Sequence, residues 1–241
     1  MIVIVILFGI CIGSFVNVVI YRFPLGLDFV RGRSFCPHCH HQLNWQDLIP
    51  VFSWILVRGK CRHCKSEISI RYMIIEIMSG ILAFICFHQF GISFMMIFSF
   101  ILSMILLCIS VIDIDTMIIY GRFILCCLIC SIISLWFDQN FIDKMIGFFI
   151  ASVPMLVLNL FKECFGGGDI KLIAVNGFLL GWKRTLIAMY IAFILGGIYA
   201  FCLIIRKKIK INQYIAFGPF LCIGIFVSWL YGYHLIYFFF F

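Results

Sequence analysis

The chain has 241 residues, of which 65% are hydrophobic and 12% are charged, and its formal net charge is +8. A water-soluble domain of this length does not need so much apolar surface, so the composition excludes that class and indicates a polytopic membrane protein. The positive charge would suit a nucleic-acid-binding protein, but its distribution follows a membrane topology instead, and no nucleic-acid partner is expected.

Eight apolar runs predict an all-α protein with about eight transmembrane helices, embedded in a lipid bilayer. The first run lacks a basic start and a small-residue cleavage site, so we interpret it as a retained helix whose N-terminus lies outside the cytoplasm. The run 172–182 would cover only about 16 Å as a helix, so it must tilt or extend through its flanks to cross. The runs are 1–19, 73–90, 91–112, 123–137, 145–161, 172–182, 185–205 and 211–241.

The basic residues support this topology. With eight spans, 15 of the 18 Lys and Arg residues fall in cytoplasmic segments, and only Lys144, Lys183 and Arg184 fall outside. This is the distribution that the positive-inside rule predicts. If 172–182 does not cross, 13 of the Lys and Arg residues fall in cytoplasmic segments and 5 fall outside. Under either count, the acidic residues near positions 113 and 169 lie at the cytoplasmic face.

One polar segment, 23–72, interrupts the apolar pattern and contains Cys36-Pro-His-Cys39 and Cys61-Arg-His-Cys64, with 21 residues between the pairs. Two such pairs are typical of a tetrahedral zinc site made of four thiolates. Two disulfides or four unrelated thiols are the alternatives, and a cytoplasmic location argues against persistent disulfides. The sequence thus predicts three domains: a first transmembrane helix (1–22), a small cytoplasmic zinc-binding domain (23–72) and a membrane core (73–241). Four nearby histidines are interpreted as surface residues rather than ligands: His38, His40, His41 and His63.

Two aspartates are placed where a membrane protein tolerates charge least. Asp113 ends the apolar run 91–112, and Asp169 follows Gly166, Gly167 and Gly168 after another apolar run. A carboxylate close to hydrocarbon costs roughly 2.5–3.5 kcal/mol, so its default interpretation is functional. Two carboxylates at the same depth suggest one acid/base site, in which the pair shares a proton and activates water.

Residues near the two aspartates bear on whether they form a catalytic site, ion pairs or an ion path. Asp115 lies two positions after Asp113, about 200° around a helix, so only one of them is expected to face a common partner. The glycines allow close backbone approach, with Asp169 near the start of the next helix. The alternative is that the aspartates pair with Arg122 or Lys171, or line an ion path.

These residues resemble the type IV prepilin peptidases, bacterial membrane aspartic peptidases. The resemblance extends over nearly the whole chain, with three departures: Tyr120 where the family usually has proline, Gly121 where Asp or Asn is common, and Ala216 where proline usually precedes Phe-Gly-Pro. The motifs that carry it are Gly13-Ser14-Phe15-Val16-Asn17-Val18-Val19-Ile20-Tyr21-Arg22, the two cysteine pairs, Trp45-Gln46-Asp47-Leu48-Ile49-Pro50, Ser53-Trp54, Arg71-Tyr72 with Glu76, the Asp113 segment, Gly166-Gly167-Gly168-Asp169-Ile170-Lys171-Leu172 and Phe217-Gly218-Pro219-Phe220.

The resemblance implies a two-step enzyme of the bacterial inner membrane. It implies that Asp113 and Asp169 cleave the basic leader of type IV prepilins or type II secretion pseudopilins on the cytoplasmic side. It also implies that the enzyme methylates the new N-terminal residue with S-adenosylmethionine, and that the zinc domain supports substrate docking and methylation. Supporting site residues are Asp115, Gly166, Gly167, Gly168 and Lys171. The alternatives are a peptidase without methyltransferase activity, and an ion-coupled transporter that uses the same aspartates.

Overall fold

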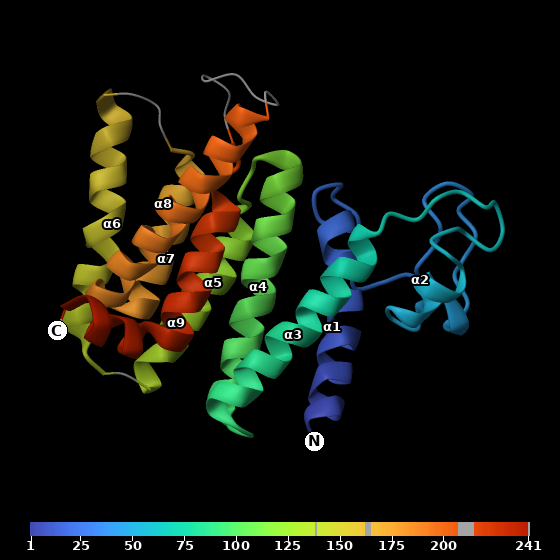
Figure 1. Cartoon of the computed structure of the whole chain (residues 1–241), viewed down its shortest axis with the longest axis horizontal. Helices are drawn as coiled ribbons and strands as arrows, with labels where there is room; N and C mark the ends of the chain where they lie inside the picture. Colours follow the sequence, from blue (N-terminus) through green and yellow to red (C-terminus); the bar gives the residue numbers. More distant parts are fainter. Residues whose placement is uncertain (138, 162–164, 207–214, 241) are drawn as a thin grey trace. The chain divides into compact units, whose positions relative to one another are not determined.

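The computed structural model describes residues 1–137, 139–161, 165–206 and 215–240, and in this part of the chain it forms helices and no strand. The long helices are α1 (Ile2–Arg22), α3 (Arg71–Phe90), α4 (Phe94–Thr116), α6 (Phe141–Phe161), α8 (Trp182–Ile205) and α9 (Gly218–Phe240). The shorter elements are η1 (Trp45–Leu48), α2 (Phe52–Leu56), α5 (Gly121–Ile133), η2 (Ser134–Trp136) and α7 (Gly167–Leu180). Figure 1 shows their course from the N-terminus to the C-terminus.

The six long helices are long and apolar enough to cross a membrane, so the predicted all-α polytopic fold is confirmed. The predicted total of about eight includes two shorter helices, α5 and α7. Helix α7 begins five residues before the apolar run 172–182, because the glycine run and Asp169 form its first turn. Its 14 residues span about 21 Å, less than the hydrocarbon thickness of about 30 Å.

The chain divides into two compact units, Met1–Met104 and Ile105–Phe241, with the boundary inside α4. In the first unit, α1 packs along α3 through small residues. A Cβ added to Gly9 would lie 2.6 Å from the Ala83 Cβ, and the Ser79 hydroxyl donates a 2.6 Å hydrogen bond to the Gly9 carbonyl. The polar segment 23–72 connects these two helices (Figure 1).

The second unit is built around α7, which contacts α5, α6, α8 and α9. Most side chains of α7 are buried, as expected for a short helix surrounded by longer ones. Glycines allow its closest contact: a Cβ added to Gly147 of α6 would collide with the Gly177 carbonyl oxygen of α7, and the reverse holds for Gly177. This contact packs the C-terminal half of α7 against α6, and Asp169 is the buried residue of the first turn of α7.

Candidate active site and metal centre

Asp113 lies in the last two turns of α4 and is only 5% exposed. Its Oδ2 accepts a 3.0 Å hydrogen bond from the backbone N–H of Gly218, the first residue of α9. Asp115, two residues later on the same helix, is exposed. The helical rotation between these residues therefore separates them as expected: Asp113 enters the core and Asp115 does not.

Gly218 can make this bond only because it lacks a side chain. A Cβ at this position would lie 2.5 Å from Asp113 Oδ2 and 3.3 Å from Ile119 Cδ1. The positive end of the α9 dipole also faces the carboxylate, and it favours a negative charge there. Gly218 belongs to the Phe-Gly-Pro motif, but no pattern in the sequence predicts this contact with Asp113.

Asp169 lies in the first turn of α7 and is 8% exposed. Its neighbour Gly168 packs on Ile119, which also packs on Gly218, the residue that binds Asp113, so the two aspartates lie around one shared side chain. Asp169 Oδ1 is buried and has no hydrogen-bond partner within the described residues. A buried carboxylate oxygen without a partner is costly, so this oxygen is available to carry a proton or to contact a substrate.

The three glycines before Asp169 differ in what they contact. A Cβ on Gly166 would lie 3.1 Å from Asp169 Oδ2, and one on Gly168 would lie 2.8 Å from the Ile119 Cβ. A Cβ on Gly167 would have no neighbour within 4 Å. Gly166 and Gly168 therefore allow close approach at the site, as predicted for the run as a whole, while Gly167 has no such contact. Lys171, the predicted supporting residue, is exposed on α7.

Tyr120, in the loop between α4 and α5, has a backbone conformation that a proline could also adopt. This residue precedes α5 in an extended conformation with φ −73°, within the range that proline imposes. Backbone strain is taken up earlier in the loop, at Met117, whose φ is +53°. The loop thereby directs Ile119 against Gly168 and Gly218, close to both aspartates.

Contacts of Asn159 and Phe217 hold Phe165, the residue just before the glycine run. The Asn159 side chain accepts a 2.9 Å hydrogen bond from the Phe165 N–H and donates one of 2.7 Å to the Phe165 carbonyl. The Phe165 ring lies 5.8 Å from the Phe217 ring, which precedes Gly218. These contacts connect the approach to Asp169 with the residue that binds Asp113. Asn159 was not among the predicted site residues, although an amide within the apolar run 145–161 is a detectable signal.

The four predicted metal ligands also come together. The ligand sulfurs of Cys36, Cys39, Cys61 and Cys64 all lie within 4.8 Å of one another, and Cys36 Sγ is 3.9 Å from Cys64 Sγ. Zinc bound by four thiolates at about 2.3 Å would place the sulfurs about 3.8 Å apart. All four are free thiols, so the predicted disulfide alternative is not what the structure forms.

The two cysteine pairs fold as equivalent knuckles. In the first, the Cys36 N–H donates to the His41 carbonyl and the His40 N–H to the Cys36 carbonyl, at 3.0 and 2.9 Å. The second repeats this pattern around Cys61, and the residue four positions after each first cysteine has a positive φ, +54° at His40 and +60° at Lys65. All four nearby histidines are exposed, and none belongs to the cluster of sulfurs.

The environment of Cys64 favours its thiolate form. The Ser66 hydroxyl lies 3.0 Å from the sulfur, and hydrogen bonds from the side chain and backbone of Ser66 lower the pKa of the Cys64 thiol to about 6. The thiolate is the form of cysteine that binds metal. In its distances and its chemistry, the cluster fits one tetrahedral metal ion.

These features define a multi-pass α-helical membrane protein with a buried aspartate pair and a four-cysteine cluster able to hold a metal ion. Residues 7–90 match the bacterial peptidase A24 N-terminal domain, and residues 100–201 match the type IV leader peptidase family.

Relatives from three bacteria support the same assignment. The chain is 30% identical over 233 residues to a prepilin leader peptidase/N-methyltransferase of Bacillus subtilis, covering 94% of this chain and 92% of the relative. A Burkholderia pseudomallei protein with the same name is 32% identical over 252 residues, covering 91% of this chain and 82% of the relative. One from Myxococcus xanthus is 33% identical over 199 residues, covering 79% of this chain but only 59% of the relative. The chain therefore belongs to the type IV leader peptidase family. No solved structure shows a significant match.

Proposed function

We propose that this protein cleaves the leader peptide of type IV prepilins or related pseudopilins at the cytoplasmic face of the bacterial inner membrane, and then methylates the new N-terminal residue. The observation that supports the peptidase assignment is that Asp113 and Asp169 are both buried and lie around Ile119, which packs on Gly168 and Gly218. The relatives, named for both activities, support the two-step reaction.

The geometry supports a division of labour within the pair. Asp113 accepts the Gly218 N–H at the start of α9, which stabilises its charged form. Asp169 has a buried oxygen without a partner, which favours its protonated form. The charged carboxylate takes a proton from water, the water oxygen attacks the scissile carbonyl carbon, and the protonated carboxyl donates a hydrogen bond to the carbonyl oxygen. Both residues come from helix ends, so a substrate helix can stay in the bilayer while its leader junction reaches them.

The proposal also includes a structural metal ion and a methyl donor. Cys36, Cys39, Cys61 and Cys64 would hold a structural zinc ion, which would stabilise a segment with few buried side chains. S-adenosylmethionine, when bound, supplies the methyl group. We retain the predicted domain division of first helix (1–22), zinc domain (23–72) and membrane core (73–241), with methylation assigned to the zinc domain and cleavage to the core.

Mass spectrometry of a co-expressed prepilin tests this function, because leader removal and the added methyl group are read separately. The wild type should produce both changes, while Asp113→Asn or Asp169→Asn should lower cleavage by about 10²–10⁴-fold and leave the metal content unchanged. Cleavage without methylation would indicate the peptidase-only alternative. Full cleavage by either variant would refute the paired mechanism, and ion flux without cleavage would favour a transporter.

A further inference from the structure

The short helix α2 leaves one apolar face exposed. The side chains of Phe52, Ile55 and Leu56, called the α2 face below, are all exposed, that of Leu56 by 73%. Their spacing of three and four positions places them on the same side of a helix. Trp45 of η1, which contacts α2, is also 73% exposed. Apolar side chains gathered in this way mark an interaction surface.

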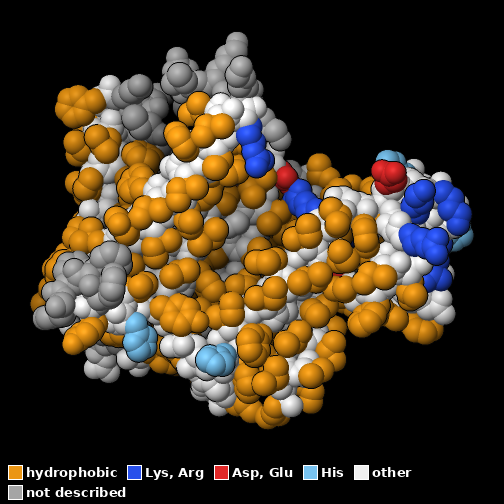
Figure 2. Space-filling view, viewed as in Figure 1, with side chains coloured by type: hydrophobic (Ala, Val, Ile, Leu, Met, Phe, Trp, Pro, Cys, Tyr) orange, Lys and Arg blue, Asp and Glu red, His pale blue; other side chains and the backbone are white. Residues whose placement is uncertain are grey.

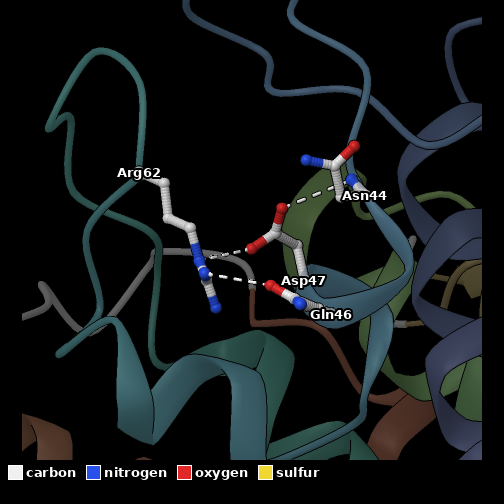
Figure 3. Close-up of polar contacts among 4 residues, drawn as sticks. All are labelled: Asn44, Gln46, Asp47 and Arg62. Atoms are coloured by element: carbon white, nitrogen blue, oxygen red, sulfur yellow. Dashed lines mark hydrogen bonds and ion pairs between the residues drawn. The ribbon is translucent and has the colours of Figure 1, made fainter.

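The opposite side of α2 is fixed to the cysteine segment. The Trp54 indole N–H donates a 3.1 Å hydrogen bond to the Ile68 carbonyl, and a Cβ added to Gly59 would lie 2.8 Å from the Trp54 ring. Arg62 of the second knuckle forms a 2.7 Å ion pair with Asp47 of η1 (Figure 3). The fold of the segment therefore sets the direction in which the α2 face points.

A hydrogen bond to α3 fixes the level of α2. Val51, which precedes α2, donates its N–H to the Glu76 carboxylate at 2.7 Å. Glu76 lies five residues after Arg71, the first residue of α3, which is about 7.5 Å along the helix axis. Since α3 is long and apolar enough to cross a membrane, α2 begins beside the second turn of a spanning helix. Interfacial helices bury their apolar faces to a similar depth, about 5–10 Å.

Basic side chains border the α2 face. Leu56 lines an open pocket together with Arg58, Lys60, Arg62 and Lys65. Arg62 is held by its ion pair within the segment, while the other three cations, called the basic rim below, are exposed and form no ion pair among the described residues. Figure 2 shows Lys and Arg side chains gathered over this segment, next to hydrophobic ones. An apolar face bordered by cations matches the acyl chains and the phosphate of an anionic phospholipid.

We propose that α2 and the second knuckle dock on the bilayer surface, with the α2 face among the lipid headgroups and the basic rim on the phosphates of anionic phospholipids. The segment 23–72 joins two helices able to cross the membrane, so it is already tethered at one leaflet and needs little additional affinity to dock. The basic leader of a prepilin fits this surface less well, because the segment has seven basic and three acidic residues and would repel it. Docking fixes the orientation of the four-cysteine cluster at the membrane surface.

Photo-cross-linking of the full-length protein in phosphatidylcholine nanodiscs tests this proposal. The nanodiscs carry either photoreactive phosphatidylglycerol or photoreactive phosphatidylcholine at the same mole fraction, and the labelled peptides are mapped by mass spectrometry. In the wild type, residues 45–65 should be labelled at least about fivefold more by the anionic lipid, the factor that one Lys or Arg near the surface contributes. Labelling of the exposed apolar side chains of α1 is the internal reference.

Paired substitutions separate the basic rim from general charge. Arg58→Gln combined with Lys60→Gln should lower the preference for the anionic lipid at least about fivefold. Arg31→Gln combined with Arg33→Gln removes the same charge from exposed positions outside the pocket, so it is the matched control and should keep the preference. Both double variants should keep the zinc content of the wild type.

The apolar part of the surface is tested by Phe52→Ser combined with Leu56→Ser. This variant should lower the labelling of residues 45–65 by both lipids, while the labelling of α1 stays the same.

Four results would overturn the proposal. The first is a wild type in which residues 45–65 are unlabelled, or are labelled equally by the two lipids. The second is an equal loss of preference in both charge variants. Loss of zinc from the Arg58 and Lys60 variant would assign the basic rim to the metal cluster instead. Cross-linking of a co-reconstituted prepilin to residues 45–65, with loss of the lipid label, would assign the surface to the substrate.

Discussion

The cysteine segment and the aspartate pair reach their geometry by different routes. In residues 23–72 only Cys36, Gly59 and Cys61 are buried, so this segment has almost no apolar core and depends on turns, hydrogen bonds and its four-cysteine cluster. The aspartates instead lie in a helical core, and Asp113 is bound by a residue 105 positions away in the sequence. One site is local in sequence and the other is assembled by helix packing.

This difference implies that the two proposed activities can be separated by mutation. Damage to the knuckles should affect metal content and methylation, while damage to the helix contacts around the aspartates should affect cleavage. A knuckle variant that lost cleavage, or a helix-contact variant that lost metal, would show that the two regions depend on one another.

The largest effect is expected from Cys61→Ser, because it removes a buried thiolate from the cluster. Zinc content measured on the purified protein should fall from about one ion per chain to near zero, since a missing ligand removes a large part of a binding free energy of about 10–16 kcal/mol. Methylation should be lost and cleavage retained. Cys202→Ser, at an exposed cysteine of α8, is the control; unchanged zinc in the Cys61 variant would disprove the metal assignment.

Gly218→Ala should lower the kcat of cleavage by roughly 100-fold with little change in KM, since its methyl group would displace the Asp113 carboxylate. The pH profile of cleavage should also shift, because Asp113 loses a donor that stabilises its charged form. Gly197→Ala in α8 is the matched control, because a Cβ there meets nothing within 4 Å. Equal kinetics in the two variants would show that the Gly218 contact is not needed.

Asn159→Ala should lower kcat about tenfold, because it releases both hydrogen bonds that hold Phe165 ahead of the glycine run. Zinc content should not change. Leu160→Ala, at the next position of α6 and 78% exposed, controls for the loss of side-chain volume. If the Asn159 variant lost zinc but kept its cleavage rate, the division between the two regions would be wrong.

The smallest effect is expected from Asp115→Asn. This side chain is exposed, so the cleavage rate should stay within about twofold of the wild type. Asp113→Asn, two residues away, is the natural comparison in the same assay. A loss of similar size in both variants would mean that Asp115, and not only Asp113, belongs to the reacting group.

Local sequence patterns predicted the long helices, the cysteine knuckles and the different environments of Asp113 and Asp115. Apolar runs predicted the six long helices because a bilayer demands continuous apolar segments. The spacing of the cysteine pairs predicted the knuckles because each pair folds on itself. The helical period separated Asp113 from Asp115, since two positions on a helix face different directions.

Tertiary structure alone decided which backbone reaches the aspartates. Nothing local to Gly218 or Ile119 indicates that one binds Asp113 while the other packs on Gly168. Such contacts join residues far apart in the chain, and they exist only once α4, α7 and α9 have packed. The physical reason is that helix packing is set by the shapes of whole surfaces, so the partner of a given residue cannot be read from its neighbours in sequence.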